Sequence, residues 1–246
     1  MSQLIDMEAA REFMRETLVK VERQNLVDIA RSLEEKSALF RDYLAADKLP
    51  ALTKDEFARV LDRIFAIRRK LPELYEHISF EQLREAVHEL LYGKQEPHLR
   101  FQAFCEQLGE LPEPLKYDMA GEFLHFTFPE KYWLWSRWMW DPKNKTGALP
   151  LVTTEDFDLA GNNLGEVYLK VGKAVAFVHS VAEPAEFQFI HRSLFGTDVY
   201  LSCVYIIYSY TILQMKMTKE FNEVMPGITE FSRRLLGVYG LQEATA

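Results

Sequence analysis

The first hundred residues carry a pattern of apolar positions that is typical of long helices. From Leu4 to Ala46 apolar residues recur at spacings of three and four, with charged residues between them and no Gly or Pro. The first proline is Pro50 and the first glycine is Gly93, so no helix breaker stands early in the chain. The pattern predicts either one very long helix or two helices broken near Asn25.

Two capping boxes mark the next helix starts. In such a box a hydroxyl side chain and a Glu or Gln three residues later satisfy free backbone N–H groups reciprocally. The first box pairs Thr53 with Glu56, and the second pairs Ser79 with Gln82. The helices predicted from here to the first internal boundary span residues 53–70, 79–93 and 97–108.

All four tryptophans fall between Trp133 and Trp140. If residues 131–140 form a helix, Trp133, Arg137 and Trp140 share one face, and the opposite face is apolar as well. A turn-forming, locally basic loop follows at residues 142–147. Two interpretations stay open, a buried core helix or a half-buried helix that offers an aromatic face to a ligand or partner. The candidate binding residues are Trp133, Arg137, Trp140, His125, Lys143 and Lys145.

The rest of the chain continues the helical pattern after an extended connection at residues 148–152. A short helix is predicted from Thr153 to Gly161, and a longer one from Asn163 to Val181. Three more predicted helices span residues 184–195, 197–224 and 228–238.

The Tyr-rich stretch at residues 199–215 must be tested as a membrane span. It is only about seventeen residues long, at the lower edge of spanning length. Polar residues such as Ser209 and Gln214 interrupt it, and its tyrosines are spread along it instead of standing at its ends. We therefore interpret it as a helix buried in protein, with no membrane span.

These elements predict an all-α, bundle-like domain, about two-thirds helix, with a long N-terminal helix or helical pair and a buried Tyr-rich C-terminal helix. The best internal boundary is the Pro-rich stretch 111–114. It separates an N-terminal helical region, 1–110, from a C-terminal helical region, 111–246, that holds the Trp-rich segment. The boundary is too short for a flexible linker, so the two regions are expected to form one compact unit.

Charge and cysteine content narrow the function classes. The formal net charge is −8, and neither half of the chain has the basic excess that nucleic-acid binding requires. Cys105 and Cys203 lie in apolar helical contexts and predict free thiols in a reducing compartment. The N-terminal residues lack an apolar signal core. We expect a cytoplasmic protein that does not bind nucleic acid.

Two Glu-x-x-His pairs are the only hint of metal chemistry. Glu85 with His88 and Glu122 with His125 have the spacing of helical di-iron ligands. Six histidines in a chain this acidic give about one such pair by chance, so these four residues are weak metal candidates. Nucleophile contexts such as Gly-x-Ser-x-Gly are absent from the sequence, and it identifies no cofactor.

One local resemblance concerns residues 111–136. The order Leu-Pro at 111–112, Met-Ala at 119–120, Phe-Leu-His-Phe at 123–126, Pro129 and Tyr132 to Ser136 resembles the hairpin and following helix of helix-hairpin-helix DNA glycosylases. Glu, Pro and Leu at 113–115 replace the family's glycine-rich hairpin, and Trp135 and Ser136 stand where its catalytic Asp would fall. The resemblance implies at most a degenerate, nucleic-acid-associated protein without glycosylase activity.

The function predicted from these observations is that of a non-catalytic cytoplasmic interaction or accessory protein, which self-associates or docks on a protein partner. The long N-terminal helix has more apolar residues than one bundle neighbour needs, as in helices that pair across a dimer interface. The alternative is a helical enzyme or carrier that binds a small cofactor or metal in a pocket near His125 and the Trp cluster.

Overall fold

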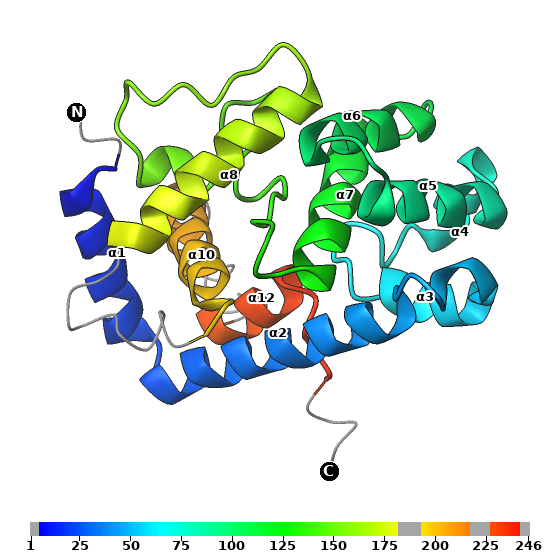
Figure 1. Ribbon diagram of the computed structural model, residues 1–246. Coiled ribbons are helices and arrows are strands. Elements are labelled where there is room, and N and C mark those ends of the chain that lie inside the picture. Colours follow the sequence, from blue (N-terminus) through cyan, green and yellow to red (C-terminus); the bar gives the residue numbers. More distant parts are fainter. Residues whose placement is uncertain (1–4, 182–192, 217–226, 242–246) are drawn as a thin grey trace.

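Ten α-helices and no β-strand form the regular structure of the described residues, in a computed structural model that is 65% helical. The structure describes residues 5–181, 193–216 and 227–241. The predicted all-α fold is confirmed, and its helix packing is compatible with a bundle (Figure 1). The helices are α1 (Met7–Lys20), α2 (Arg23–Tyr43), α3 (Lys54–Leu61), α4 (Leu71–His77), α5 (Phe80–Tyr92), α6 (Pro97–Gln107), α7 (Glu113–Thr127), α8 (Leu164–Val181), α10 (Gly196–Lys216) and α12 (Ile228–Leu235).

The apolar pattern of the N-terminus forms two helices, so the second of the two predicted alternatives is confirmed. The break lies at Val21 and Glu22, just before the predicted position near Asn25. Val21 leaves the helix with an extended backbone and puts its side chain in the core. Burial of this β-branched side chain is compatible with the extended conformation that ends α1.

Both predicted capping boxes are present, at the starts of α3 and α5. Helix α3 ends at Leu61, earlier than the predicted end near Lys70. Residues 62–70 instead form a series of turns that bury Ile64 and Ile67 completely. Helix α6 forms as predicted, with Pro97 in its first turn.

Helix α7 is the centre of the fold, and almost all its residues from Leu115 onward are buried. It packs against α2, α5 and α6, while α8 lies on α6, and α10 contacts both α1 and α12 (Figure 1). The apolar face of α2 is covered within the chain by α7, α12 and α10. Most of the apolar residues that suggested a dimer interface therefore pack inside the protein, while Val19 and Val27 stay exposed.

The predicted helix at residues 131–140 is wrong, because this stretch has no helical structure and contains only the end of a turn at 131 and a turn at 137–139. The predicted extended connection at 148–152 is wrong as well, since residues 149–151 form a 3₁₀ turn, η2 (Leu149–Leu151). Residues 153–161 form no helix either. There Asp158 accepts a hydrogen bond from the Ala160 amide at 2.9 Å, which competes with helical bonding.

The C-terminal helices largely follow the prediction. Helix α8 begins after Asn163, whose side chain accepts from the Glu166 amide at 2.9 Å. Helix α10 begins at Gly196 and is buried over its first three turns. The predicted helix at 184–195, apart from its last residues, and the end of the one predicted to 224 lie outside the described residues. None of the described helices combines the length and apolarity that a membrane crossing requires.

Candidate functional site

The Trp-rich segment, residues 133–140, crosses α7 as irregular backbone and places the indole rings of Trp135 and Trp138 in the core. Trp135 has 0% exposure and stacks between Tyr117 and Phe101, at ring distances of 4.5 and 5.4 Å. Its Nε1 donates to the Trp140 carbonyl at 3.0 Å. Trp138 is buried too. Of the two interpretations left open, the core interpretation holds for Trp135 and Trp138.

Gly121 allows this segment to lie directly on α7. A Cβ atom at Gly121 would stand 2.0 Å from the main-chain oxygen of Trp135, a distance that no side chain can occupy. Gly172 in α8 is a useful contrast, because its nearest neighbour would be the Trp133 ring at 3.8 Å, an ordinary contact. The close approach explains why a glycine stands in the middle of a buried helix.

Gly121→Ala is expected to destabilise the protein by about 1–3 kcal/mol, because the backbone of the Trp-rich segment must move away from α7. Gly172→Ala is the matched control and should be neutral or stabilising by up to about 1 kcal/mol, since it only improves helix propensity. Thermal melts of both variants test the pair. Equal melting temperatures would mean that the two helix surfaces are equally tolerant, contrary to the structure.

Asp118 holds the Trp-rich segment to α7 from the other side. Its Oδ1 accepts hydrogen bonds from the Ser136 hydroxyl at 2.9 Å and the Arg137 amide at 2.6 Å. Burial raises the pKa of Asp118 from 3.8 to about 7, although these two hydrogen bonds act in the opposite direction. The carboxyl is therefore a buried group that titrates near neutral pH.

Asp118 gives stability a specific pH dependence. Because its pKa is higher in the folded state, the native protein binds this proton more tightly than the unfolded chain does. The stabilisation from protonated Asp118 is complete below about pH 4 and is lost as the pH rises to about 7. We expect the difference in unfolding free energy between wild type and D118N to change over this range. Urea denaturation at several pH values tests it, and parallel pH profiles for the two proteins would contradict it.

A buried ion pair connects α7 to α2. Lys36 Nζ lies 2.5 Å from Glu122 Oε2 and also donates to the Leu236 carbonyl at 2.8 Å. Both side chains are almost completely buried. Burial lowers the pKa of Lys36 and raises that of Glu122, while their mutual attraction opposes both shifts. The pair joins the central helix to the N-terminal helix and to the turn after α12.

His125 forms a second buried pair on the same helix. Its Nε2 lies 3.0 Å from Asp198 Oδ2 at the start of α10, and its Nδ1 lies 2.8 Å from the Tyr132 carbonyl. Burial lowers the pKa of His125, but the Asp198 carboxylate, the Tyr132 carbonyl and the charge of Glu122 together outweigh it and raise the pKa above its usual value. Both ring nitrogens thus have protein partners. We name Lys36, Glu122, His125 and Asp198 the buried charge cluster.

The sequence-predicted metal candidates divide between core and surface. Glu122 and His125 belong to the buried charge cluster, whereas Glu85 is exposed on α5 and the His88 ring lies tilted against Tyr92 at 5.4 Å. Within the described ranges no three His, Cys, Asp or Glu side chains come close enough together to hold a metal ion. The structure therefore does not bring the two Glu-x-x-His pairs into one site.

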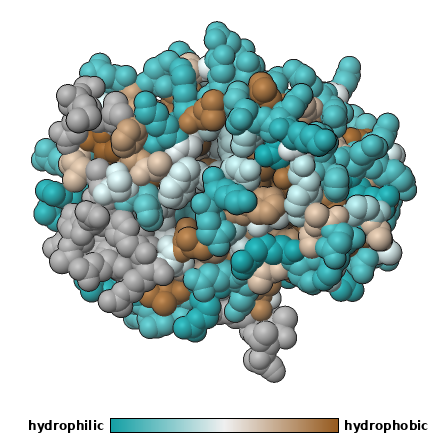
Figure 2. All heavy atoms as spheres, in the orientation of Figure 1, coloured by the Kyte–Doolittle hydropathy of each residue, from teal (hydrophilic) through white to brown (hydrophobic). Residues whose placement is uncertain are grey.

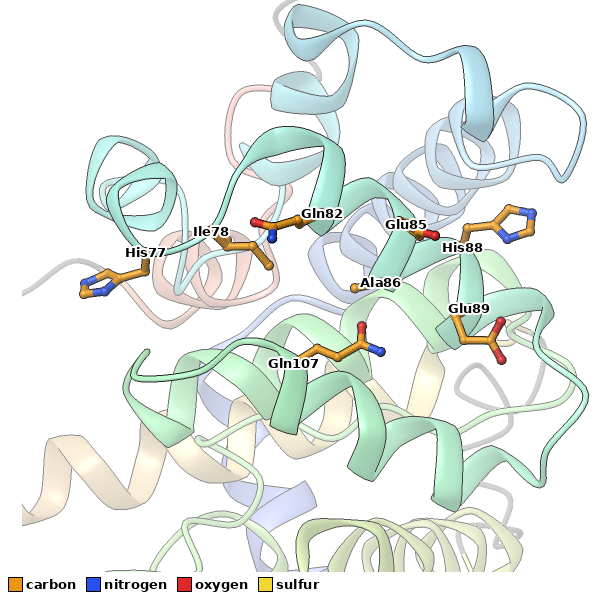
Figure 3. A pocket seen from close by; sticks show the side chains of 8 residues that line it. All are labelled: His77, Ile78, Gln82, Glu85, Ala86, His88, Glu89 and Gln107. Atoms are coloured by element: carbon orange, nitrogen blue, oxygen red, sulfur yellow. The ribbon is translucent and has the colours of Figure 1, made fainter.

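Glu85 and His88 line a surface pocket of about 520 Å³ against α6. His77 lines it as well, but Figure 3 shows His77 and His88 at opposite ends of the pocket, with their rings pointing away from each other. The remaining lining residues named in the figure include the amides Gln82 and Gln107. The two imidazoles cannot act on one ligand in this arrangement.

The predicted face of Trp133, Arg137 and Trp140 is wrong because the segment is not helical. Trp133 is half-buried, with its ring 5.3 Å from that of His179, and Arg137 is exposed. Trp140 is 7% exposed and lines a different part of the surface. Lys143 is exposed in a turn, and its main-chain amide donates a hydrogen bond to the Asp141 side chain at 3.0 Å.

Two adjoining pockets form what we call the Trp140 groove. One has a volume of about 590 Å³ and the other about 390 Å³, and they share Pro142, Gly161 and Val167. Among the six predicted binding residues, Trp140 and Lys145 line the larger pocket. The acidic loop at residues 155–158, which the sequence did not single out, lines it too.

The remaining exposed apolar side chains do not gather on one face. In Figure 2 the visible surface is mostly hydrophilic, with separate apolar patches. The large exposed apolar residues lie on different elements, and scattered residues of this kind are normal for a protein surface. In the described residues they are Val19, Val27, Phe65, Leu99, Leu169, Leu194, Tyr208 and Tyr239.

Comparisons of the chain with protein-family models, with curated proteins and with solved structures give no match. The resemblance to helix-hairpin-helix glycosylases therefore stays a prediction. The functional interpretation rests on the geometry of the chain itself.

Proposed function

We propose that this protein is a non-catalytic interaction protein that binds a protein partner in the Trp140 groove. The observation that carries the proposal is the composition of the groove, where the apolar side chains Trp140, Phe157 and Val167 adjoin a polar rim. An apolar centre with a polar rim is the usual anatomy of a protein interface. Tryptophan is also enriched among the residues that dominate binding energy.

The groove has rigid support on both sides, which favours specific binding. Gly165, in the first turn of α8, donates from its amide to Gln102 of α6 at 3.1 Å. The turn that carries Lys145 is closed by main-chain pairing of Asp141 with Thr146, at 2.7 Å. Binding residues on loops that a rigid scaffold positions are a common arrangement in proteins.

The buried charge cluster contains the titratable groups best suited to acid–base chemistry, and its contacts support a structural role. His125, Glu122 and Asp198 are buried and bonded to one another or to Lys36. His125 lines neither part of the groove. We therefore propose that the buried charge cluster holds the helices together, and we propose no chemical step.

We further propose that the protein works in a reducing compartment, which the cytoplasm provides. Cys105 and Cys203 are both buried free thiols, and burial raises the pKa of each. Unpaired buried cysteines are the usual state in reducing compartments.

Photo-crosslinking tests the proposed function. The photoreactive amino acid p-benzoylphenylalanine replaces Phe157 in the groove, or Phe65, which is 47% exposed and lies outside the groove, as the matched control. In cells of the source organism we expect a protein adduct that forms at position 157 and not at position 65. An adduct between two copies of the chain would assign the groove to self-association. Absence of an adduct at 157, or the same adducts at both positions, would overturn the proposal.

A further inference from the structure

We infer that the Trp140 groove takes a basic segment of the partner protein, with an apolar side chain of that segment placed against Trp140 and Phe157. The inference rests on the proposed function and specifies the chemistry of the occupant. It depends on two observations, the acidic charge of the groove and the apolar side chains in its wall.

The groove is acidic along its whole length. Five carboxylates and two lysines line its two pockets. Four of the carboxylates form no ion pair with any residue that the structure describes, namely Glu106, Glu113, Glu155 and Asp156. The lysine Lys116 is already engaged, since it donates to the Gly109 carbonyl. A cationic segment is the charge complement of such a surface.

Not every carboxylate in the groove is available for a partner. Asp158 is held by Lys170, 2.6 Å away, and by the Ala160 amide, so it fixes the loop that forms one wall. Glu155 and Asp156 precede it in the same loop and are exposed. These two neighbouring carboxylates are the main recognition charges, and their exposure allows substitution without a packing defect.

Trp140 provides the second observation. It is more than nine-tenths buried and lines the larger pocket, but its indole Nε1 has no hydrogen-bond partner within the described residues. The hydroxyl of Thr154, which lines the same pocket, lacks one as well. A buried donor without an acceptor is unfavourable and uncommon in native proteins. Both polar atoms are closed off from solvent, so the apolar surface of the pocket wall is the part that a bound segment contacts.

Together these features define the occupant. Trp140, Phe157 and Val167 offer an apolar contact, and Glu155 and Asp156 attract positive charge. A peptide segment with Lys or Arg on both sides of an apolar residue satisfies both at once. A small polyamine would satisfy only the charge.

Binding of a defined peptide, measured by fluorescence anisotropy at low salt, tests the inference. The labelled peptide KRKLKRK is expected to bind wild-type protein, and its affinity should fall about five- to tenfold for E155Q/D156N. The matched control E73Q/E76Q removes two exposed carboxylates from α4, which lines neither pocket, and should leave affinity unchanged. The peptide KRKGKRK should bind more weakly, and EDELEDE should not bind.

Each contrary result removes the inference. If KRKLKRK does not bind, or if the two double variants weaken it equally, the groove does not select a basic segment. If spermine competes with KRKLKRK at equal charge concentration, or KRKGKRK binds equally well, the apolar contact is absent. A photo-adduct at position 157 without peptide binding would overturn this inference and leave the proposed function standing, whereas failure of both would remove both.

Discussion

Trp135→Ala is expected to lower the free energy of unfolding by about 3–5 kcal/mol, as large aromatic truncations in cores do. Trp135 is completely buried, stacks between Tyr117 and Phe101, and donates its indole N–H to the Trp140 carbonyl. The variant leaves a cavity at the junction of α6, α7 and the Trp-rich segment, and leaves that carbonyl without its donor. Urea denaturation followed by far-ultraviolet circular dichroism measures the loss.

Trp133→Ala is the control for that experiment. Its side chain is only half-buried, and its ring contacts His179 near the protein surface. We expect a loss of about 1–2 kcal/mol, because less apolar surface is removed from the core. Equal losses at Trp133 and Trp135 would contradict the structure, since one lies at the edge of the core and the other in its centre.

Lys36→Met is expected to cost about 3–5 kcal/mol, the typical result of removing one partner of a buried ion pair. The variant leaves Glu122 buried without its counter-charge, and leaves the Leu236 carbonyl without its donor. The methionine side chain has similar length, so packing against Phe126, which now lies 4.0 Å below the ammonium group, is largely kept.

The double variant Lys36→Met/Glu122→Leu separates charge from packing. Replacing both charges by apolar groups is often neutral or stabilising, so the double variant should recover most of the stability that the single variant loses. Denaturation of wild type, both single variants and the double variant completes the cycle. A double variant as unstable as Lys36→Met would show that the pair is not the cause of the loss.

The helices that the sequence predicted well are those whose signals are local. The capping boxes at Thr53 and Ser79 and the Asn163 cap depend only on residues within one helical turn, and all three form. The end of α3 was missed because it depends on Ile64 and Ile67 reaching the core through turns. Tertiary packing decides where this helix ends, and the spacing of apolar residues along the sequence does not reveal it.

The helix predicted for the Trp-rich segment is wrong for the same reason. A stretch that is apolar all round fits a buried helix and a buried irregular chain equally well. The deciding partners are Asp118, which binds the Arg137 amide, and Gly121, which lets the main chain of Trp135 approach. Both lie on a different helix, so residues 131–140 alone carry no trace of them.

Part of the buried charge cluster had a signal in the sequence. Its members Glu122 and His125 share one face of an otherwise apolar helix with Asp118, which lies outside the cluster, at spacings of four and three. Lys36 occupies a position in the apolar stripe of α2 between Leu33 and Phe40. Charged residues at apolar positions of a helix indicate buried ion pairs. Which residues pair across α2, α7 and α10 follows only from the fold.

Two of the binding residues predicted from the sequence line the Trp140 groove. Trp140 and Lys145 were named because aromatic and basic residues cluster near them, and both line it. Glu155, Asp156 and Phe157 were missed because residues 153–161 were assigned to a short helix. The groove exists because this irregular loop meets Pro142 and the first turns of α8, which no local pattern reveals.

The most direct test of the central claim is to identify, by tandem mass spectrometry, the partner residues that crosslink to p-benzoylphenylalanine at position 157. We expect one partner protein, with its crosslinked residues in a segment that is rich in Lys and Arg and contains an apolar residue. We also expect that E155Q/D156N in the same protein lowers the yield of this adduct several-fold, while E73Q/E76Q does not. Capture of an acidic segment, or of many unrelated proteins, would contradict binding of a basic segment in the Trp140 groove. An adduct yield that neither double variant changes would contradict it as well.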